Sequence, residues 1–498
     1  EVVNSLIESE ILIRDNDGWE LARTIGETDI PSTINGVLSA RIDRLQKDAK
    51  RILQEASVIG RAFFYAILKR VSDLKVPVEE YLSGLEQLDL IRVRALEPDL
   101  EYIFKHALTQ EVVYNGILKK ERQEIHERIG LAIETLFKDR LSEFCETLAY
   151  HFTRGQSVTR AIDYLVKSGE KSLARYAVEE AHQYFRKAYD ILVSKEELSE
   201  AEKIILIDIL NSWGYVYYFL GEIREFINIF RSHQDMAESL QNKAKTGMFY
   251  VWYGTAHYMA GLTKEGYEYL CKALKLGQSA GDQKVVGYAC TWLPWTCAEL
   301  GFFDEGIGYG ERAQKIAGSY PSDQYLYFKS LGGLCLIYFY IGDTRRIFEG
   351  AKDLLDYGER NANSRSKVIG HWMEAFGHQA AGDMKSAQKS CEKAMEVALD
   401  PFYANFPNFT LGVASFFNGQ LQKAEDAFQS SIKFGEKYGE GEMSMICQCF
   451  MAPILIAKGE MQQGTKLMED AQKALIRNQR RYSYALSEYI LGEVNSQI

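Results

Sequence analysis

Glycines at a nearly constant spacing constrain the fold of this chain more than any other feature. They recur at steps of 40, 40, 41, 40, 37 and 40 residues, at Gly221, Gly261, Gly301, Gly342, Gly382, Gly419 and Gly459. Glycine adopts the left-handed conformation that ends many α-helices. A fixed period of this length is typical of repeat proteins, in which each unit stacks on its neighbours. We therefore predict an array of helix–turn–helix units.

Small residues flank the turn glycines at fixed offsets. Five residues after the glycine stand Gly266, Gly306, Ala387, Ala424 and Gly464, with Phe226 and Ile347 as exceptions. Seven residues before it stand Gly214, Gly254, Cys335, Ala375, Gly412 and Ala452, with Pro294 as the exception. Small side chains let two antiparallel helices cross closely. The glycine-rich run Gly306–Gly310 therefore indicates close helix packing and not a cofactor loop.

The spacing of small and large residues resembles the tetratricopeptide repeat. That repeat has a period of 34 residues, so the longer period here predicts longer helices. HEAT repeats have a similar period but lack a turn glycine followed by a small residue. We expect a mainly α-helical chain whose residues 155–498 form a tetratricopeptide-like α-solenoid of about eight to nine units. The two units before Gly221 match the pattern loosely.

Aromatic residues precede several turn glycines, on the helices expected to line the concave face of the solenoid. They are Tyr215, Tyr218, Tyr258, Trp295, Phe339, Trp372 and Phe376. Aromatic side chains are favoured anchors in binding interfaces. One hypothesis is a groove that binds a protein segment or a small-molecule signal. The alternative is that these rings only pack one helix against the next.

The sequence pattern of residues 30–118 differs from that of the repeats and predicts a winged-helix domain. Helices are expected near 31–45, 49–58, 63–68 and 78–88, followed by short β-strands at 90–93 and 102–104. A hairpin around Gly18 precedes this domain, and residues 119–154 are expected to be connecting helices. The helix at 78–88 contains three glutamates and no lysine or arginine. Such a helix is repelled by a DNA groove, so nucleic-acid binding is not expected.

The strand predicted at residues 102–104 runs directly into a helix through Lys105 and His106. The helix is expected to begin near Ala107, with Thr109 and Gln110 facing away from the core. Backbone N–H groups at a helix start attract anions. His106 is therefore a candidate for contact with a phosphate, or for a purely structural role.

Composition excludes several classes of protein. The net charge of −11 over 498 residues argues against a general nucleic-acid binder. No G-x-x-x-x-G-K-[ST] phosphate loop, metal-ligand spacing or nucleophile set occurs, so we expect no catalytic centre, cofactor or metal in this chain. No apolar run is long enough to suggest a membrane span. The eight cysteines are scattered in apolar patterns, as in a reduced cytoplasmic protein.

Three stretches carry a family resemblance: IPSTINGVLSARIDRLQKDAKRILQEASVIGRAFF, YIFKHALTQEVVYNGIL and LAYHFTRGQSVTRAIDYLVKSGEKSLARYAVEEAHQYFRKAYDIL. They resemble the C-terminal half of bacterial STAND-type AAA-like signalling ATPases, in which a class III adenylate or guanylate cyclase domain often comes first. The resemblance implies an upstream NTPase domain that binds ATP or ADP, whose lid region would end within residues 1–29. It also implies that His106, with Lys105, senses the nucleotide, although the family's Met-His-Asp motif is Lys-His-Ala here.

Two functions follow from these observations. The first is a regulatory module, in which the winged helix and the solenoid restrain an upstream NTPase until the solenoid binds its signal. The second is a tetratricopeptide-like scaffold that assembles proteins without switching.

Overall fold

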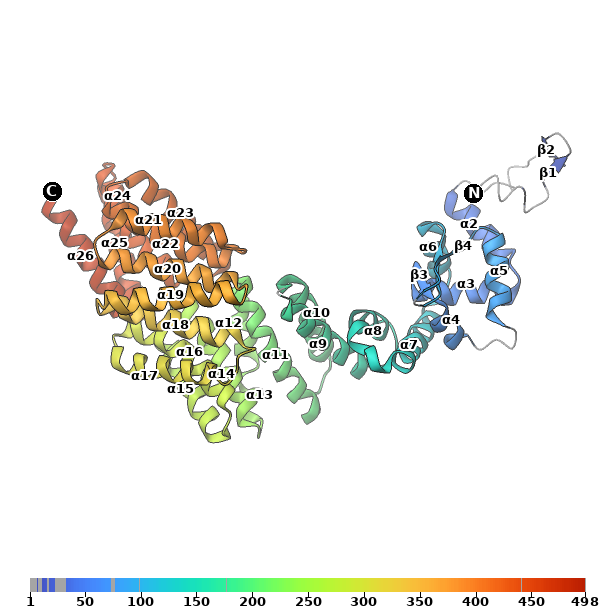
Figure 1. Cartoon of the computed structure of the whole chain (residues 1–498), viewed down its shortest axis with the longest axis horizontal. Helices are drawn as coiled ribbons and strands as arrows, with labels where there is room; N and C mark the ends of the chain where they lie inside the picture. Colours follow the sequence, from blue (N-terminus) through green and yellow to red (C-terminus); the bar gives the residue numbers. More distant parts are fainter. Residues whose placement is uncertain are drawn as a thin grey trace. The chain divides into compact units, whose positions relative to one another are not determined.

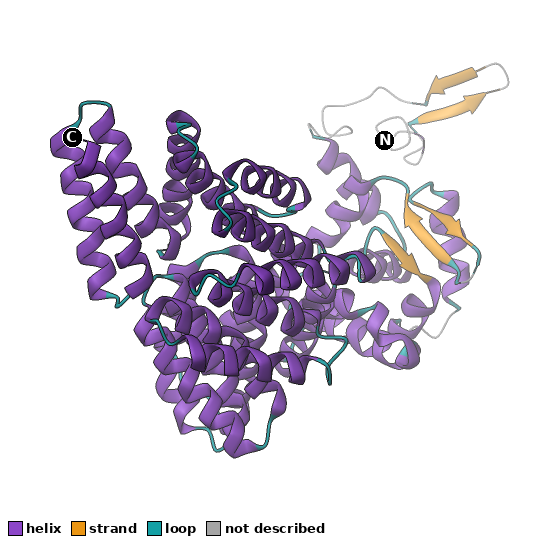
Figure 2. Ribbon diagram, turned by 60° about the vertical axis from the view of Figure 1, so that its left-hand side comes forward, coloured by secondary structure: helices purple, strands orange, loops and turns teal. Residues whose placement is uncertain are grey.

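The computed structural model describes residues 7, 11–15, 18–22, 33–72, 77–97, 99–175, 177–439 and 441–497. The chain divides into two compact units. Unit 1 comprises residues 1–175 and 183–194, and unit 2 comprises residues 176–182 and 195–498. Helices dominate both units, and the described strands all belong to unit 1 (Figures 1 and 2). The mainly α-helical fold is therefore confirmed.

Unit 1 begins with a hairpin of β1 (Leu12–Asp15) and β2 (Gly18–Leu21). The residues before this hairpin lie largely outside the described part of the chain. A small α/β domain follows, and its elements are α2 (Ile34–Asp43), α3 (Lys47–Ile59), β3 (Ala62–Phe64), α4 (Tyr65–Val71), α5 (Val78–Gln87), β4 (Ile91–Ala95), β5 (Glu101–Phe104) and α6 (Ala107–Asn115). The three strands form an antiparallel sheet in the order β3-β5-β4. Leu53, Phe63, Leu82 and Phe104 belong to its core.

Two local predictions for this domain are wrong. Phe63 and Phe64 form a strand and not a helix, because Gly60 ends α3 with a φ of 152° and β5 offers a pairing edge. Thr109 and Gln110 do not face away from the core. Thr109 is fully buried, and the Gln110 side chain donates a hydrogen bond of 2.7 Å to the Ser57 carbonyl. Both errors arise where a partner distant in the sequence decides the structure.

Three helices and a short 3₁₀ segment follow in unit 1. They are α7 (Lys119–Leu136), the 3₁₀ segment Lys138–Glu143, α8 (Cys145–Phe152) and α9 (Val158–Ala174). Glu127 on α7 fixes the start of α9, since its carboxylate accepts hydrogen bonds from the backbone N–H groups of Gln156 and Ser157 at 2.8 and 3.0 Å. The next helix, α10 (Val178–Val193), is divided between the two units.

Unit 2 is an α-solenoid of antiparallel helix pairs. Its helices are α11 (Glu200–Leu220), α12 (Ile223–Ser232), α13 (Gln234–Ser239), α14 (Lys243–Met259), α15 (Thr263–Ala280), α16 (Gln283–Leu300), α17 (Phe303–Ala317), α18 (Gln324–Tyr340), α19 (Thr344–Arg360), α20 (Ser364–Ala380), α21 (Met384–Val397), α22 (Pro401–Phe417), α23 (Leu421–Tyr438), α24 (Glu442–Ala457), α25 (Met461–Arg477) and α26 (Arg481–Gln497). Most of these helices have 16 to 18 residues, for example α24 and α15. The prediction of long helices is confirmed.

The turn glycines adopt the backbone conformation that their spacing predicted. All seven have φ between 72° and 90°. After several of these glycines, the N–H of the next residue donates a hydrogen bond back to a carbonyl in the last turn of the helix. One example is the hydrogen bond of 2.9 Å from the Phe302 N–H to the Cys297 carbonyl. This pattern is the Schellman motif, which satisfies carbonyl groups at a helix end. Local backbone chemistry therefore sets the repeat.

The small residues allow the close helix crossings that the sequence predicted. A Cβ atom placed on Gly254 would lie 2.9 Å from the Gly266 carbonyl oxygen, and one placed on Gly266 would lie 3.0 Å from the Gly254 carbonyl oxygen. Real Cβ atoms essentially never come closer than 3.0 Å to another heavy atom and seldom come as close as 3.0 Å. The close crossing of α14 and α15 therefore depends on the absence of side chains at these two positions.

Unit 2 also closes on itself, which its repeat pattern did not predict. The Tyr218 hydroxyl on α11 lies 3.0 Å from the Tyr403 hydroxyl on α22, 185 positions further along. The Gly441 N–H, just before α24, donates a hydrogen bond of 3.0 Å to the Met259 carbonyl at the end of α14. Helix α16 packs against α26. The concave faces of early and late repeats therefore meet.

Two glycines on α17 provide a matched test of the packing. A Cβ on Gly306 would lie 2.8 Å from the Cys297 Cβ, whereas a Cβ on exposed Gly308 would meet nothing within 4 Å. We expect Gly306→Ala to lower the free energy of unfolding by about 1–3 kcal/mol, because the added methyl overpacks the interface. Gly308→Ala should raise it by about 0.5–1 kcal/mol, because alanine is favoured over glycine inside helices.

Urea unfolding followed by tryptophan fluorescence would measure both changes, since five of the six tryptophans lie in unit 2. Equal effects of the two substitutions would contradict the packing described for α17.

Candidate functional site: an aromatic chamber in unit 2

The inner helices of unit 2 enclose a chamber with a volume of about 200 Å³. Six of the seven aromatic residues proposed from the sequence line it: Tyr218, Tyr258, Trp295, Phe339, Trp372 and Phe376. The seventh, Tyr215, is not among the lining residues. Its ring instead packs edge-on against Phe219, Trp252 and Tyr325. Whether the chamber binds a ligand stays a prediction.

Later repeats supply much of the chamber wall, and the sequence analysis missed these residues. They include Phe402, Phe406, Phe409, Phe417, Met443, Ile446, Tyr482 and Leu486. Phe409 and Phe417 carry the same signal as the predicted residues, because they precede a turn glycine on an inner helix. The residues on α26 carry no such signal, since their place in the wall depends on the closure of the solenoid.

Ring packing and hydrogen bonds hold the wall rigidly. The rings of Trp295 and Trp372 stack at 6.1 Å between centroids, and Trp372 also stacks on Phe406 at 5.1 Å. The Trp372 indole N–H donates to the Thr410 hydroxyl at 2.7 Å, and the Trp295 indole N–H donates to the Lys329 carbonyl at 3.2 Å. A buried indole with a satisfied N–H is held in one orientation. The chamber is therefore largely preformed.

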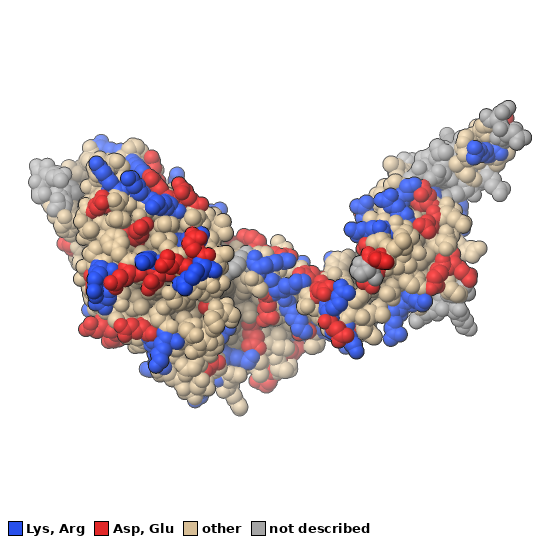
Figure 3. Space-filling view, viewed as in Figure 1, with Lys and Arg blue, Asp and Glu red and all other residues tan. Residues whose placement is uncertain are grey.

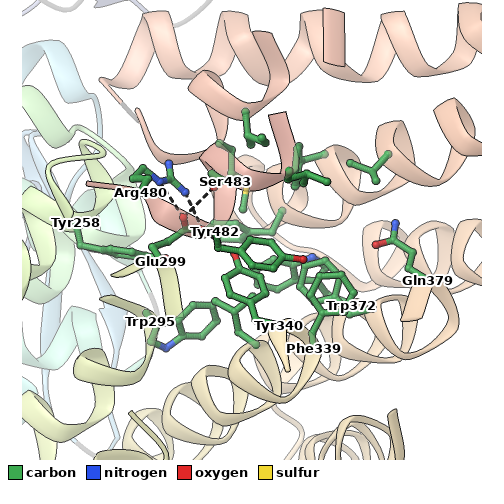
Figure 4. Close-up of a pocket in the computed structure, with 18 of the residues that line it drawn as sticks. Tyr258, Trp295, Glu299, Phe339, Tyr340, Trp372, Gln379, Arg480, Tyr482 and Ser483 are labelled. Carbon is green, nitrogen blue, oxygen red and sulfur yellow. Dashed lines mark hydrogen bonds and ion pairs between the residues drawn. The ribbon is translucent and has the colours of Figure 1, made fainter. Parts of the chain in front are cut away.

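A buried ion pair forms one end of the chamber and joins α16 to the start of α26 (Figure 4). The Arg480 guanidinium lies 3.1 Å from the Glu299 carboxylate, and both residues are at most 2% exposed. Glu299 also accepts hydrogen bonds from the Tyr340 hydroxyl at 2.6 Å and the Ser483 hydroxyl at 2.8 Å. Tyr482 stacks on Tyr340 beside the pair, with an angle of 6° between the rings. These five residues form the clasp.

The electrostatics of the clasp favour an ionised carboxylate. Burial by itself would raise the pKa of Glu299, but the charge of Arg480 and the three hydrogen-bond donors outweigh it and lower the pKa below its usual value. Glu299 and Arg480 therefore remain a charged pair at neutral pH.

The Lys329 side chain lies among aromatic rings of the chamber wall. The Lys329 Nζ is 4.1 Å from the Trp295 ring centroid, 4.5 Å from that of Trp292 and 5.3 Å from that of Tyr218. Lys329 is only 3% exposed. Aromatic faces attract cations, and more strongly where water is excluded. This arrangement places the Lys329 amino group among the aromatic rings of the wall.

Some of the residues that line the chamber are accessible to solvent. Phe417 is 41% exposed, and Val413 and Gln379 are half-buried. Gln379 lies at the far side of the chamber from the Glu299–Arg480 pair (Figure 4). The chamber wall therefore combines a buried ion pair with several partly exposed residues.

The strand-to-helix corner of unit 1 is as the sequence predicted. Strand β5 ends at Phe104, and His106 is the N-cap residue of α6, with φ −122° and ψ 135°. The His106 side chain is exposed and does not cap the helix. Lys105 forms an ion pair with Asp89. A role in sensing nucleotide stays a prediction.

Unit 1 also contains a buried pair of histidines. The Nδ1 atoms of His126 on α7 and His151 on α8 lie 2.9 Å apart, and the Tyr114 hydroxyl lies 3.1 Å from His126 Nε2. Burial, with Arg154 and Arg122 nearby, lowers the pKa of His126 to about 4. Burial, followed by the charges of His126 and Arg154, lowers that of His151 to about 3. Both histidines bind a proton less readily in the folded than in the unfolded protein. Their protonation therefore lowers the free energy of unfolding as the pH falls below about 6.5.

The described residues contain no group of three or more His, Cys, Asp and Glu side chains placed to bind a metal. All eight cysteines are free, and seven are buried. None of the described helices has both the length and the hydrophobicity needed to span a bilayer. Acidic and basic side chains alternate over the face shown in Figure 3.

Comparison with known proteins finds no family model that matches the chain. An uncharacterized protein of Rhizobium meliloti (strain 1021) is 27% identical over 197 residues. That segment is 37% of this chain but 19% of the rhizobial protein, so this chain spans a small part of its relative.

Several solved structures resemble the chain at low sequence identity. A STAND protein with a tetratricopeptide repeat sensor from Pyrococcus horikoshii matches 84% of this chain and 68% of its own, with 15% identity and a TM-score of 0.37. A Rap protein complexed with competence and sporulation factor matches 68% and 98%, with 11% identity and a TM-score of 0.46. Aspartyl phosphate phosphatase F of Bacillus subtilis matches 79% and 95%, with 12% identity and a TM-score of 0.42. These similarities assign no function to the chain.

Removal of one charge of the buried Glu299–Arg480 pair should make unit 2 less stable. We expect Glu299→Gln to lower the free energy of unfolding by about 3–5 kcal/mol, because Arg480 then remains buried without its counter-charge. Since the pKa of Glu299 is lowered, the pair stabilises the wild type at neutral pH and this contribution disappears as acid protonates the carboxylate.

The control is Glu392→Gln, which breaks the exposed pair with Lys423 and should change stability by less than about 0.5 kcal/mol. Urea unfolding at pH 7 measures both variants. A similar small loss in both would show that the clasp does not hold the solenoid closed.

Proposed function

We propose that this chain is the ligand-sensing, regulatory part of a signalling protein. The observation that carries the proposal is the preformed aromatic chamber, which unites an apolar wall with a few fixed polar groups. Ligand sites in proteins generally have this composition. In this proposal a ligand binds in the chamber, contacts early and late repeats together, and shifts unit 2 between two states.

Unit 1 would transmit that shift to an NTPase domain elsewhere in the longer protein. The element order from α3 to β5 is helix, strand, helix, helix, strand, strand, which supports the winged-helix assignment. The resemblance to STAND ATPases supports ATP or ADP as the nucleotide of that domain. A nucleotide cyclase is one effector that such a protein would control.

The chamber can be tested with a neutral apolar probe, N-phenyl-1-naphthylamine, whose fluorescence rises in apolar surroundings. We expect saturable binding to the wild type. Val413→Trp should weaken it at least about tenfold, because the larger indole would occupy part of the space that Val413 lines.

Ile476→Trp is the matched control, since it adds the same ring at a position on α25 that is 58% exposed. It should leave binding unchanged. Wild type that does not bind the probe, or equal binding by both variants, would overturn the sensor proposal and favour a scaffold without a ligand.

His106 can be tested in the longer protein by nucleotide hydrolysis. We expect His106→Ala to raise basal hydrolysis, because an imidazole that contacts a phosphate would stabilise the restrained state. Lys119→Ala changes another exposed residue of unit 1 and should have no effect. Identical hydrolysis by wild type and His106→Ala would remove the sensing role.

A further inference from the structure

We infer that the chamber selects an uncharged small molecule, with an apolar body and a hydroxyl group that hydrogen-bonds to Tyr482. This inference rests on the proposed function, because it specifies the ligand of the same chamber. A wall selects the polar group of a ligand through atoms whose hydrogen-bonding capacity is still unused. The polar atoms of the wall that keep such capacity therefore define the ligand.

The charged groups of the wall already have partners. The Glu299 carboxylate is paired with Arg480 and accepts further hydrogen bonds from two hydroxyl groups. Lys329, the third charged residue that lines the chamber, also has interactions within the protein. A charged ligand would lose its hydration on entry without gaining a free counter-charge, and burial of an unpaired charge is costly. The wall therefore favours an uncharged ligand.

Several neutral polar groups of the wall are also unavailable to a ligand. The indole N–H groups of Trp295 and Trp372 donate to oxygen atoms of the protein, and the Tyr340 hydroxyl donates to Glu299. The Trp292 indole N–H has no hydrogen-bond partner among the described residues, but this atom is fully buried. These groups therefore line the chamber without selecting its ligand.

The Tyr482 hydroxyl keeps its full hydrogen-bonding capacity. Its ring stacks on that of Tyr340, but no described residue forms a hydrogen bond with the hydroxyl. Burial and the charge of Glu299 raise the pKa of Tyr482 to about 12, so the hydroxyl is protonated at neutral pH. A tyrosine hydroxyl in apolar surroundings usually has a partner. A ligand hydroxyl suits it, because such a group both donates and accepts.

Gln379 provides a second neutral group, on the far side of the chamber from the Glu299–Arg480 pair (Figure 4). Its Nε2 donates to the Thr410 carbonyl at 3.1 Å, and none of the described residues donates to its Oε1. The available groups of the wall are therefore both uncharged. Tyr482 can bind a hydroxyl in either direction, whereas an amide oxygen only accepts.

The size and lining of the chamber fit the apolar body of the ligand. Its volume is about 200 Å³, which is below the roughly 300–1,000 Å³ of sites for drug-sized ligands. Rings such as those of Phe339, Phe376 and Phe406 line it. Phenols, other aromatic alcohols and medium-chain alkanols have the required form.

Three naphthalene derivatives separate the effect of the hydroxyl from those of apolar contact and charge. They are 1-naphthol, 1-methylnaphthalene and 1-naphthoate, and their binding is measured by displacement of N-phenyl-1-naphthylamine at pH 7. We expect Tyr482→Phe to weaken 1-naphthol at least about threefold, the loss expected for one hydrogen bond, and to change 1-methylnaphthalene less than about twofold. The wild type should bind 1-naphthoate at least about tenfold more weakly than 1-naphthol.

Tyr489→Phe is the matched control, since it makes the same change on the same helix at a position that is 55% exposed. It should affect none of the three compounds. Gln379→Met removes the other available polar group and should also leave 1-naphthol binding unchanged. Circular dichroism would confirm that each variant is folded, and the comparison of 1-naphthol with 1-naphthoate needs only the wild type.

Each remaining outcome bears on a separate claim. Equal losses of 1-naphthol and 1-methylnaphthalene in Tyr482→Phe, or no loss of either, would overturn the assignment to Tyr482 while leaving the sensor proposal intact. Weaker binding of 1-naphthol in Gln379→Met alone would overturn it as well. Tighter binding of 1-naphthoate than of 1-naphthol would overturn the preference for an uncharged ligand. Failure of the wild type to bind N-phenyl-1-naphthylamine would overturn the sensor proposal itself.

Discussion

The buried ion pair between Glu299 and Arg480 is the interaction on which the chamber depends. These residues lie 181 positions apart, yet they join the third inner helix of the array to its last helix. Burying two charges costs free energy that only good geometry and further hydrogen bonds offset. Tyr340 and Ser483 supply those hydrogen bonds. Together with the Tyr218–Tyr403 and Gly441–Met259 contacts, this pair joins early and late repeats around the chamber.

The repeat itself could be predicted from the sequence because its causes are local. Each turn glycine, such as Gly301, ends a helix by adopting a positive φ, and small residues such as Gly254 and Gly266 set the helix crossing. Inward-facing aromatics follow from the same register, which is why six of the seven predicted residues line the chamber. Only Tyr215 packs elsewhere, within a cluster of rings.

The closure could not be predicted, because nothing in the spacing of the repeats indicates which distant units meet. Lys329 and Arg480 look like ordinary charged residues in the sequence, and their burial depends on neighbours contributed by other repeats. The same limit explains the error at Phe63 and Phe64, which become a strand only because β5 pairs with them. Local patterns specify the elements, whereas distant contacts specify the site.

Hydrogen–deuterium exchange across α26 tests the closure most directly, because the amides of a terminal helix are protected only as long as that helix stays docked. The wild type should protect α26 as strongly as the central helix α20. In Glu299→Gln, exchange should accelerate at least about tenfold in α26 and remain unchanged in α20. Rapid exchange of α26 in the wild type, or identical exchange in both proteins, would contradict a chamber held shut by this ion pair.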